Sequence, residues 1–122
     1  MWPRELFDIK DKKGGLIIVG LKDLHQPGVY ILYRDDHPYY VGRATKLLSR
    51  LHAHANMSGD TYFNFWNYFS VFVVPDRKHL SEVEGILIAS MPTANRSVPK
   101  VARMKLPNKL VKILKKRRTI FV

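Results

Sequence analysis

The sequence predicts a small α/β fold: one domain, residues 1–122, with a three-stranded, at least partly antiparallel sheet flanked by helices. Three runs of β-branched and aromatic residues predict the strands, at about residues 28–33, 39–42 and 64–74. The first two runs surround a short charged turn and therefore predict a β-hairpin. The third run is apolar on both sides of its alternation, which is typical of a central strand.

Three segments with helical spacing of their apolar residues complete the predicted fold. The first covers about residues 45–55, with Thr45 as the expected N-cap. The second begins near residue 78 or 81 and ends near 91, and the third covers about residues 107–118. This last helix is strongly basic outside its apolar stripe. The apolar run at residues 16–19 is compatible with a further short strand, a choice that the sequence leaves open.

Composition and charge indicate a soluble globular protein with a polyanionic partner. A chain of 122 residues with 46% hydrophobic residues can bury a core of its own, and the absence of cysteine excludes disulfides and thiolate metal sites. The net charge of +11 favours nucleic acid as the partner, with anionic lipid second. No apolar run is long enough to span a bilayer and the N-terminus lacks a signal-peptide pattern, so we expect a cytoplasmic protein with no membrane partner.

The predicted hairpin carries two tyrosines ten residues apart, Tyr30 and Tyr40. With the turn centred on Asp35, antiparallel pairing sets Tyr30 directly opposite Tyr40. Opposed residues have Cβ atoms about 4.5–5.5 Å apart on the same face of the sheet. Two phenols are therefore expected side by side at the end of a short ribbon, an arrangement that suggests a functional site.

An ordered set of motifs surrounds these tyrosines. In chain order it comprises Gly28-Val29-Tyr30, Tyr40-Val41-Gly42, Arg43, Arg50 ten residues after Tyr40, His54 at i+4 from Arg50, Glu84 before an apolar run, Pro92 and Asn95. This set resembles the GIY-YIG nuclease family over residues 27–95. The resemblance is strongest to the nuclease domain of the bacterial excision-repair incision subunit. Residues 1–26 and 96–122 then form an N-terminal extension and a basic C-terminal extension.

The resemblance implies a DNA endonuclease that hydrolyses phosphodiester bonds with one divalent ion, Mg²⁺ or Mn²⁺. Glu84 is the implied metal ligand, and a single glutamate is chemically sufficient because magnesium typically uses only one or two protein carboxylates. Arg50 is the implied clamp on the scissile phosphate, and Arg43 is a second phosphate contact.

The resemblance also implies roles for the remaining candidates. A tyrosine orients or deprotonates the attacking water; the sequence does not decide which one, and the family precedent favours Tyr40 over Tyr30. His54 is expected to hydrogen-bond one phenol and accept its proton. Asn95 is expected to fasten the end of the helix near the site, a supporting role.

Each candidate has a purely structural alternative. The tyrosines are explained equally well as core aromatics, and Arg50 as a solvated helix residue. Ser81 and Glu84 match the two ends of a capping box, in which Glu84 reaches back to the helix N-terminus. Glu82 is the alternative metal ligand on this helix.

Two other functions compete with the nuclease. A catalytically idle nucleic-acid-binding module keeps the basic surface without the site, and a membrane-surface adaptor uses the basic C-terminal helix. The complete set of Tyr30, Tyr40, Arg50, Glu84 and Asn95 favours the nuclease. In a bacterial host, we expect such a protein to be associated with the nucleoid.

Overall fold

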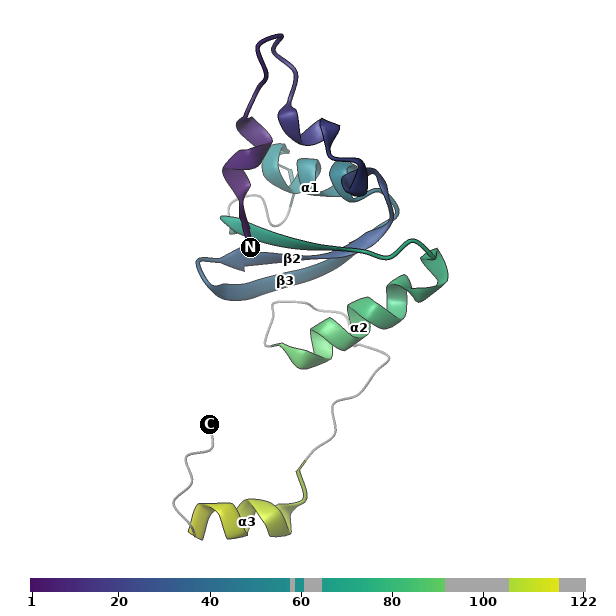
Figure 1. The fold of residues 1–122 in the computed structure, drawn as a ribbon. Coiled ribbons are helices and arrows are strands. Elements are labelled where there is room, and N and C mark those ends of the chain that lie inside the picture. Colours follow the sequence, from purple (N-terminus) through teal and green to yellow (C-terminus); the bar gives the residue numbers. More distant parts are fainter. Residues whose placement is uncertain (58, 61–64, 92–105, 117–122) are drawn as a thin grey trace.

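The computed structural model describes residues 1–57, 59–60, 65–91 and 106–116. Its centre is a four-stranded sheet in the order β1-β4-β2-β3, in which every neighbouring pair is antiparallel (Figure 1). The strands are β1 (Trp2–Pro3), β2 (Gly28–Arg34), β3 (His37–Ala44) and β4 (Tyr68–Val73). The three predicted strands are present, and the N-terminal extension adds β1 as a short edge strand that the sequence did not indicate.

Helices cover both faces of this sheet (Figure 1). On one face lies α1 (Leu47–Asn56), together with three short 3₁₀ helices of the N-terminal extension (Arg4–Asp8, Ile17–Gly20 and Lys22–His25). On the other face α2 (Leu80–Ser90) packs against β3 and β2, after a 3₁₀ turn at Arg77–His79. Among the described residues, no helix has the length and apolar content that crossing a bilayer requires.

The basic helix α3 (Asn108–Lys116) agrees with the predicted helix over its described part. Its apolar stripe does not enter the core, because Leu106, Leu110 and Ile113 are all exposed. The helix therefore presents both an apolar and a cationic surface to solvent. Residues 117 and 118, which the prediction included, lie outside the described residues.

The structure decides two local features at the ends of helices and strands. At residues 16–19, where the sequence left a short strand open, Leu16 forms an isolated antiparallel bridge with Lys10, and a 3₁₀ helix at Ile17–Gly20 buries only Ile18. Thr45 does not cap α1, whose N-cap is Lys46, without a side-chain hydrogen bond. The backbone N–H of Leu47 instead donates to the Gln26 carbonyl at 3.1 Å, so a neighbouring segment satisfies the first turn.

The third predicted strand begins later than its composition indicates. β4 starts at Tyr68, because Asn67 is used to hold the β2–β3 turn. The backbone N–H of Asn67 donates to the Tyr33 carbonyl at 2.9 Å. The Asn67 side chain accepts a hydrogen bond from the backbone N–H of Asp35 and donates one to the Asp35 carboxylate. Residues 65–67 are therefore a connection rather than strand, and residue 64 lies outside the described part of the chain.

The sheet separates two hydrophobic cores, and β2 contributes to both. Its alternation sends Tyr30 and Leu32 toward α1, and Val29 and Ile31 toward α2. The strand that is buried on both faces is therefore β2. β4 is a central strand, as predicted, because β1 and β2 pair with its two edges. It is buried only toward α1, however: on its other face Tyr68 and Phe72 are exposed, because α2 covers β2 and β3.

The hairpin register differs from the predicted one. Tyr30 lies opposite Gly42, and Tyr40 lies opposite Leu32. The turn consists of Asp35 and Asp36 rather than being centred on Asp35, and an irregularity after Leu32 shifts the pairing by one more residue. Together these shifts amount to two residues, which preserves the face of each side chain. The two tyrosines are therefore diagonal neighbours on the α1 face, with ring centroids 6.2 Å apart.

Gly42 gives the Tyr30 ring the space it occupies, which predicts the effect of a methyl group there. A Cβ at residue 42 would overlap Cζ and Oη of Tyr30. We expect Gly42→Ala to lower the free energy of unfolding by about 1–3 kcal/mol, measured by urea denaturation, because the ring must move within a packed core. Gly20→Ala is the control, since a Cβ there meets nothing within 4 Å. Equal stability of the two variants would contradict this packing.

Candidate active site

Four of the predicted site residues converge on the α1 face of the hairpin. Tyr30 comes from β2, Tyr40 from β3, and Arg50 and His54 from α1, one helical turn apart. The His54 ring lies 5.4 Å from the Tyr30 ring and 5.9 Å from the Tyr40 ring, between centroids. The fold thus gathers residues separated by up to 24 positions into one cluster of phenols, imidazole and guanidinium.

His54 is the buried centre of this cluster, with 0% of its surface exposed. Its Nε2 lies 2.8 Å from the Tyr30 hydroxyl, and its Nδ1 lies 2.8 Å from Oδ1 of Asp60. Burial lowers the pKa of His54; Asp60 opposes this shift, whereas the positive charge of Arg50 adds to it. The net shift is downward, so the imidazole is neutral at neutral pH.

Tyr30 is also held in its neutral form. Only 1% of its surface is exposed, and burial raises the pKa of the phenol, with Tyr40 adding to the rise and Arg50 opposing it. Tyr40 is only partly buried. The two phenols therefore differ: Tyr30 is an interior hydrogen-bonding group, and Tyr40 stands nearer to solvent.

Arg50 joins this cluster to a cationic pocket on the surface. Burial lowers the pKa of Arg50, but the hydrogen bond to Tyr30 and the charge of Asp60 outweigh it, so the net shift is upward. The pocket has a volume of about 530 Å³ and is lined by Arg43, Ala44, Thr45, Lys46, Ser49, Arg50 and Ala53. Among the described residues that line it are three cations and no carboxylate, a composition suited to phosphate groups.

Glu84 reaches the same strand from the other side of the sheet. It lies on α2, and its Oε1 is 3.8 Å from Nε of Arg43 on β3. Its side chain is 21% exposed; burial raises the pKa of Glu84, and Arg43 opposes the rise. The described residues contain no group of three or more metal-binding side chains, so Glu84 does not belong to such a cluster. One carboxylate completed by water suits magnesium.

The structure bears on the alternatives for α2. The helix has His79 at its N-cap, so Ser81 lies inside it and the capping-box interpretation of Glu84 is wrong. Glu82, the alternative ligand, has a 68% exposed side chain whose Oε2 is 3.4 Å from Nδ1 of His79. It is therefore largely exposed to solvent. Asn95, predicted to fasten the helix end, lies outside the described residues.

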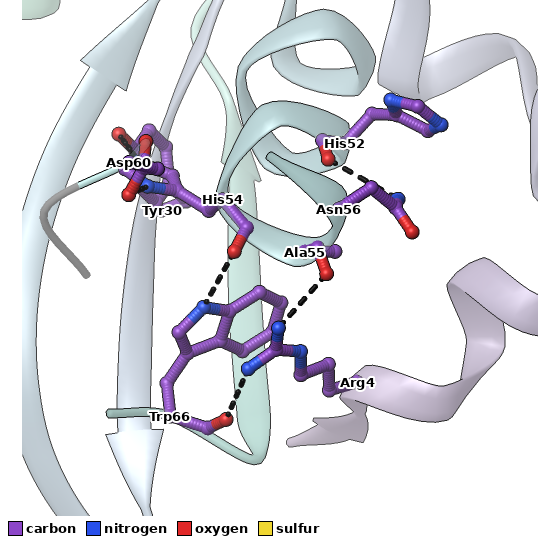
Figure 2. Close-up of polar contacts among 8 residues, drawn as sticks. All are labelled: Arg4, Tyr30, His52, His54, Ala55, Asn56, Asp60 and Trp66. Carbon is purple, nitrogen blue, oxygen red and sulfur yellow. Dashed lines mark hydrogen bonds and ion pairs between the residues drawn. The ribbon is translucent and has the colours of Figure 1, made fainter. Parts of the chain in front are cut away.

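The N-terminal extension fastens the end of α1 that carries His54 (Figure 2). The Arg4 guanidinium donates to the Ala55 carbonyl at 2.8 Å and to the Trp66 carbonyl at 3.1 Å, and lies 4.7 Å from the centroid of the Trp66 ring. The Trp66 indole N–H donates to the His54 carbonyl at 3.3 Å. These contacts satisfy carbonyl groups that the end of the helix leaves without partners.

Sequence reasoning missed three residues of this site. Lys46 was not recognised as part of the cationic pocket, although its position before α1 was visible. Asp60 follows His54 by six residues, a spacing that belongs to no helix or strand period, so no sequence signal linked the two. Arg4 is 51 residues from its partner Ala55, and only the folded chain shows that contact.

The comparisons with known proteins agree with this architecture. The family model for the GIY-YIG catalytic domain matches residues 26–91, which is more than half of the chain. The chain therefore belongs to the GIY-YIG family, a family of nuclease domains.

Solved structures similar to the chain come from the GIY-YIG N-terminal endonuclease domain of UvrC from Thermotoga maritima. The form bound to magnesium is 26% identical, with a TM-score of 0.49, over 61% of this chain and 90% of that one. A point mutant bound to the catalytic divalent cation is 25% identical, with a TM-score of 0.49, over 61% of this chain and 89% of that one. No curated protein has a significant match to the chain.

The lowered pKa of His54 predicts how stability depends on pH. An unfolded histidine takes up a proton below about pH 6.5, whereas the buried ring resists it. The unfolded state then binds more protons, so the contribution of His54 to stability is present above about pH 6.5 and is lost as the pH falls below it. We expect the excess stability of the parent over His54→Gln, from urea denaturation, to shrink between about pH 7.5 and 5.5. An excess that stays constant or grows would contradict the neutral buried ring.

Proposed function

We propose that the protein is a divalent-metal-dependent DNA endonuclease, in which water attacks a phosphodiester in line with the departing 3′ oxygen. The observation that carries this proposal is the convergence of Tyr30, Tyr40, Arg50 and His54 beside a cationic pocket in a chain of a nuclease family. Hydrolysis requires an oriented water, a proton acceptor and positive charge near the phosphoryl oxygens. This cluster contains side chains suited to each requirement.

The cationic surfaces suit a polyanionic substrate. Arg43, Lys46 and Arg50 line one pocket, and the exposed face of α3 adds Lys109, Lys112, Lys115 and Lys116. Lysine and arginine contacts to phosphates supply affinity without reading sequence. Within the pocket, Arg50 is the proposed clamp, because a planar guanidinium holds two phosphate oxygens at once. Arg43 is the second phosphate contact.

Glu84 is the proposed ligand of one divalent ion, Mg²⁺ or Mn²⁺. The UvrC domain to which the chain is similar was crystallised with a catalytic divalent cation, magnesium in one form. Burial disfavours the negative charge on Glu84, and the contact with Arg43 is long at 3.8 Å and opposes this effect only in part. A hard cation bound to the carboxylate would stabilise that charge. Such an ion polarises the phosphate and stabilises the departing oxygen.

Tyr40 is the proposed contact for the attacking water. Tyr30 is buried, is bonded to His54 and keeps its proton at neutral pH, so it is poorly placed to meet substrate itself. Tyr40 is less buried and its ring neighbours that of Tyr30. The alternative, a catalytically idle nucleic-acid-binding module, predicts that this arrangement has no effect on DNA beyond binding.

The metal site is tested by removing one charge. We expect Glu84→Gln to remain folded and to bind DNA, while magnesium-dependent cleavage of plasmid DNA falls by at least about 10²-fold. Glu82→Gln is the matched control on the same helix, and we expect it to cleave normally because its carboxylate faces solvent. Loss of activity in Glu82→Gln alone would show that the ligand assignment on α2 is wrong. Normal cleavage by both variants would contradict the proposed mechanism.

The phosphate clamp is tested by removing a guanidinium. We expect Arg50→Ala to lower the turnover rate by at least about 10²-fold, the scale for losing one preorganised charge stabiliser. Arg34→Ala, at the exposed end of β2, removes the same group away from the pocket and should leave turnover unchanged. If the Arg50 variant cuts DNA at the parent rate, Arg50 is a solvated helix residue. If the parent itself binds DNA without cutting it, the idle module is the better description.

A further inference from the structure

Asp60 has no role in the mechanism proposed above, yet it is bound to the centre of the site. Its Oδ1 lies 2.8 Å from Nδ1 of His54, and its side chain is only 9% exposed. Its backbone N–H donates to the Met57 carbonyl at 2.9 Å, which holds the residue close to the end of α1. A carboxylate this well covered and this close to a buried imidazole constrains the hydrogen atoms of that ring.

The constraint follows from what each group can donate. A neutral imidazole carries one N–H, on either Nδ1 or Nε2, and an ionised carboxylate only accepts hydrogen bonds. With Asp60 on Nδ1, the hydrogen must reside on Nδ1, and Nε2 is left as an acceptor. The Tyr30 hydroxyl, 2.8 Å from Nε2, is then the donor in its bond with His54.

This choice also limits what Tyr30 offers to its other neighbours. Its single hydrogen points at His54, so toward the Arg50 guanidinium, whose positive charge acts on the phenol, the oxygen of Tyr30 can only accept. The Tyr40 ring lies beside that of Tyr30, with centroids 6.2 Å apart.

We infer that Asp60 is a positioning residue: it holds His54 in the tautomer with hydrogen on Nδ1, so that Nε2 accepts from Tyr30 and the Tyr30 hydroxyl keeps one orientation beside Tyr40. The consequence for cleavage rests on the proposed function, whereas the tautomer of His54 does not. In that function the fixed Tyr30 side chain supports the neighbouring Tyr40, the proposed contact for the attacking water.

The tautomer is measured directly by nitrogen NMR of the full chain labelled with ¹⁵N-histidine, at neutral pH. The chain has five histidines, and the signal that disappears in His54→Gln identifies His54. We expect the parent to show a protonated Nδ1 and an acceptor Nε2. In Asp60→Asn, which keeps the shape of the side chain, the amide can also donate to Nδ1, so we expect the form with hydrogen on Nε2 to gain population. A parent with hydrogen on Nε2, or a variant with an unchanged tautomer, overturns the inference.

Cleavage kinetics distinguish positioning from a simple fastening of the loop. We expect Asp60→Asn to lower kcat at least about 10-fold, part of the 10²–10⁴-fold that general-base assistance contributes, with KM little changed. In a His54→Gln background the same substitution should cost nothing further, because Asp60 acts through His54. Asp36→Asn, in the exposed hairpin turn, is the control. Independent losses that multiply in the double variant would overturn the positioning role.

The two measurements separate the inference from the proposed function. If the parent does not cleave DNA, the proposed function fails, and the NMR spectrum still decides whether Asp60 selects the tautomer of His54. If the parent cleaves DNA but the spectrum shows the other tautomer, the nuclease stands and the role of Asp60 is rejected.

Discussion

The close approach of the Tyr30 ring to the backbone of Gly42 is the contact on which the rest of the site depends. Because residue 42 has no Cβ, the phenol lies across β3 and its hydroxyl reaches His54 on α1. The contact joins the hairpin to the helix and places one buried polar group within hydrogen-bond distance of another. A buried hydroxyl and a buried imidazole without partners would be costly, so this pairing is also a requirement for stability.

The residues before the hairpin are part of the site's support. The N-terminal extension supplies the edge strand β1, and it covers the α1 face with Phe7, Ile18 and Leu24. Arg4 then binds the carbonyl group of Ala55, next to His54 in the chain. These contacts hold the backbone at the end of α1, where His54 lies. The same segment therefore contributes to the core and to the geometry of the proposed catalytic cluster.

Charge and burial divide the site into two parts. The outer part is the pocket lined by Arg43, Lys46 and Arg50, which is cationic and reachable by a large substrate. The inner part is the row from Tyr30 through His54 to Asp60, in which burial keeps both the phenol and the imidazole neutral. Neutral groups in a row can pass a proton without separating charge over a long distance. Arg50 belongs to both parts, since it lines the pocket and its positive charge acts on Tyr30.

The sequence by itself determined the fold class, the family and most of the cluster, because strand alternation, helical i,i+4 spacing and motif order are local patterns. Tyr30, Tyr40, Arg50 and His54 were found in this way. Only the tertiary structure decided the register that pairs Tyr30 with Gly42, since it depends on a turn held by Asn67 and on an irregularity in the strand. It also decided that Asp60 meets His54, because a loop residue has no period and its position is set by the packing around it.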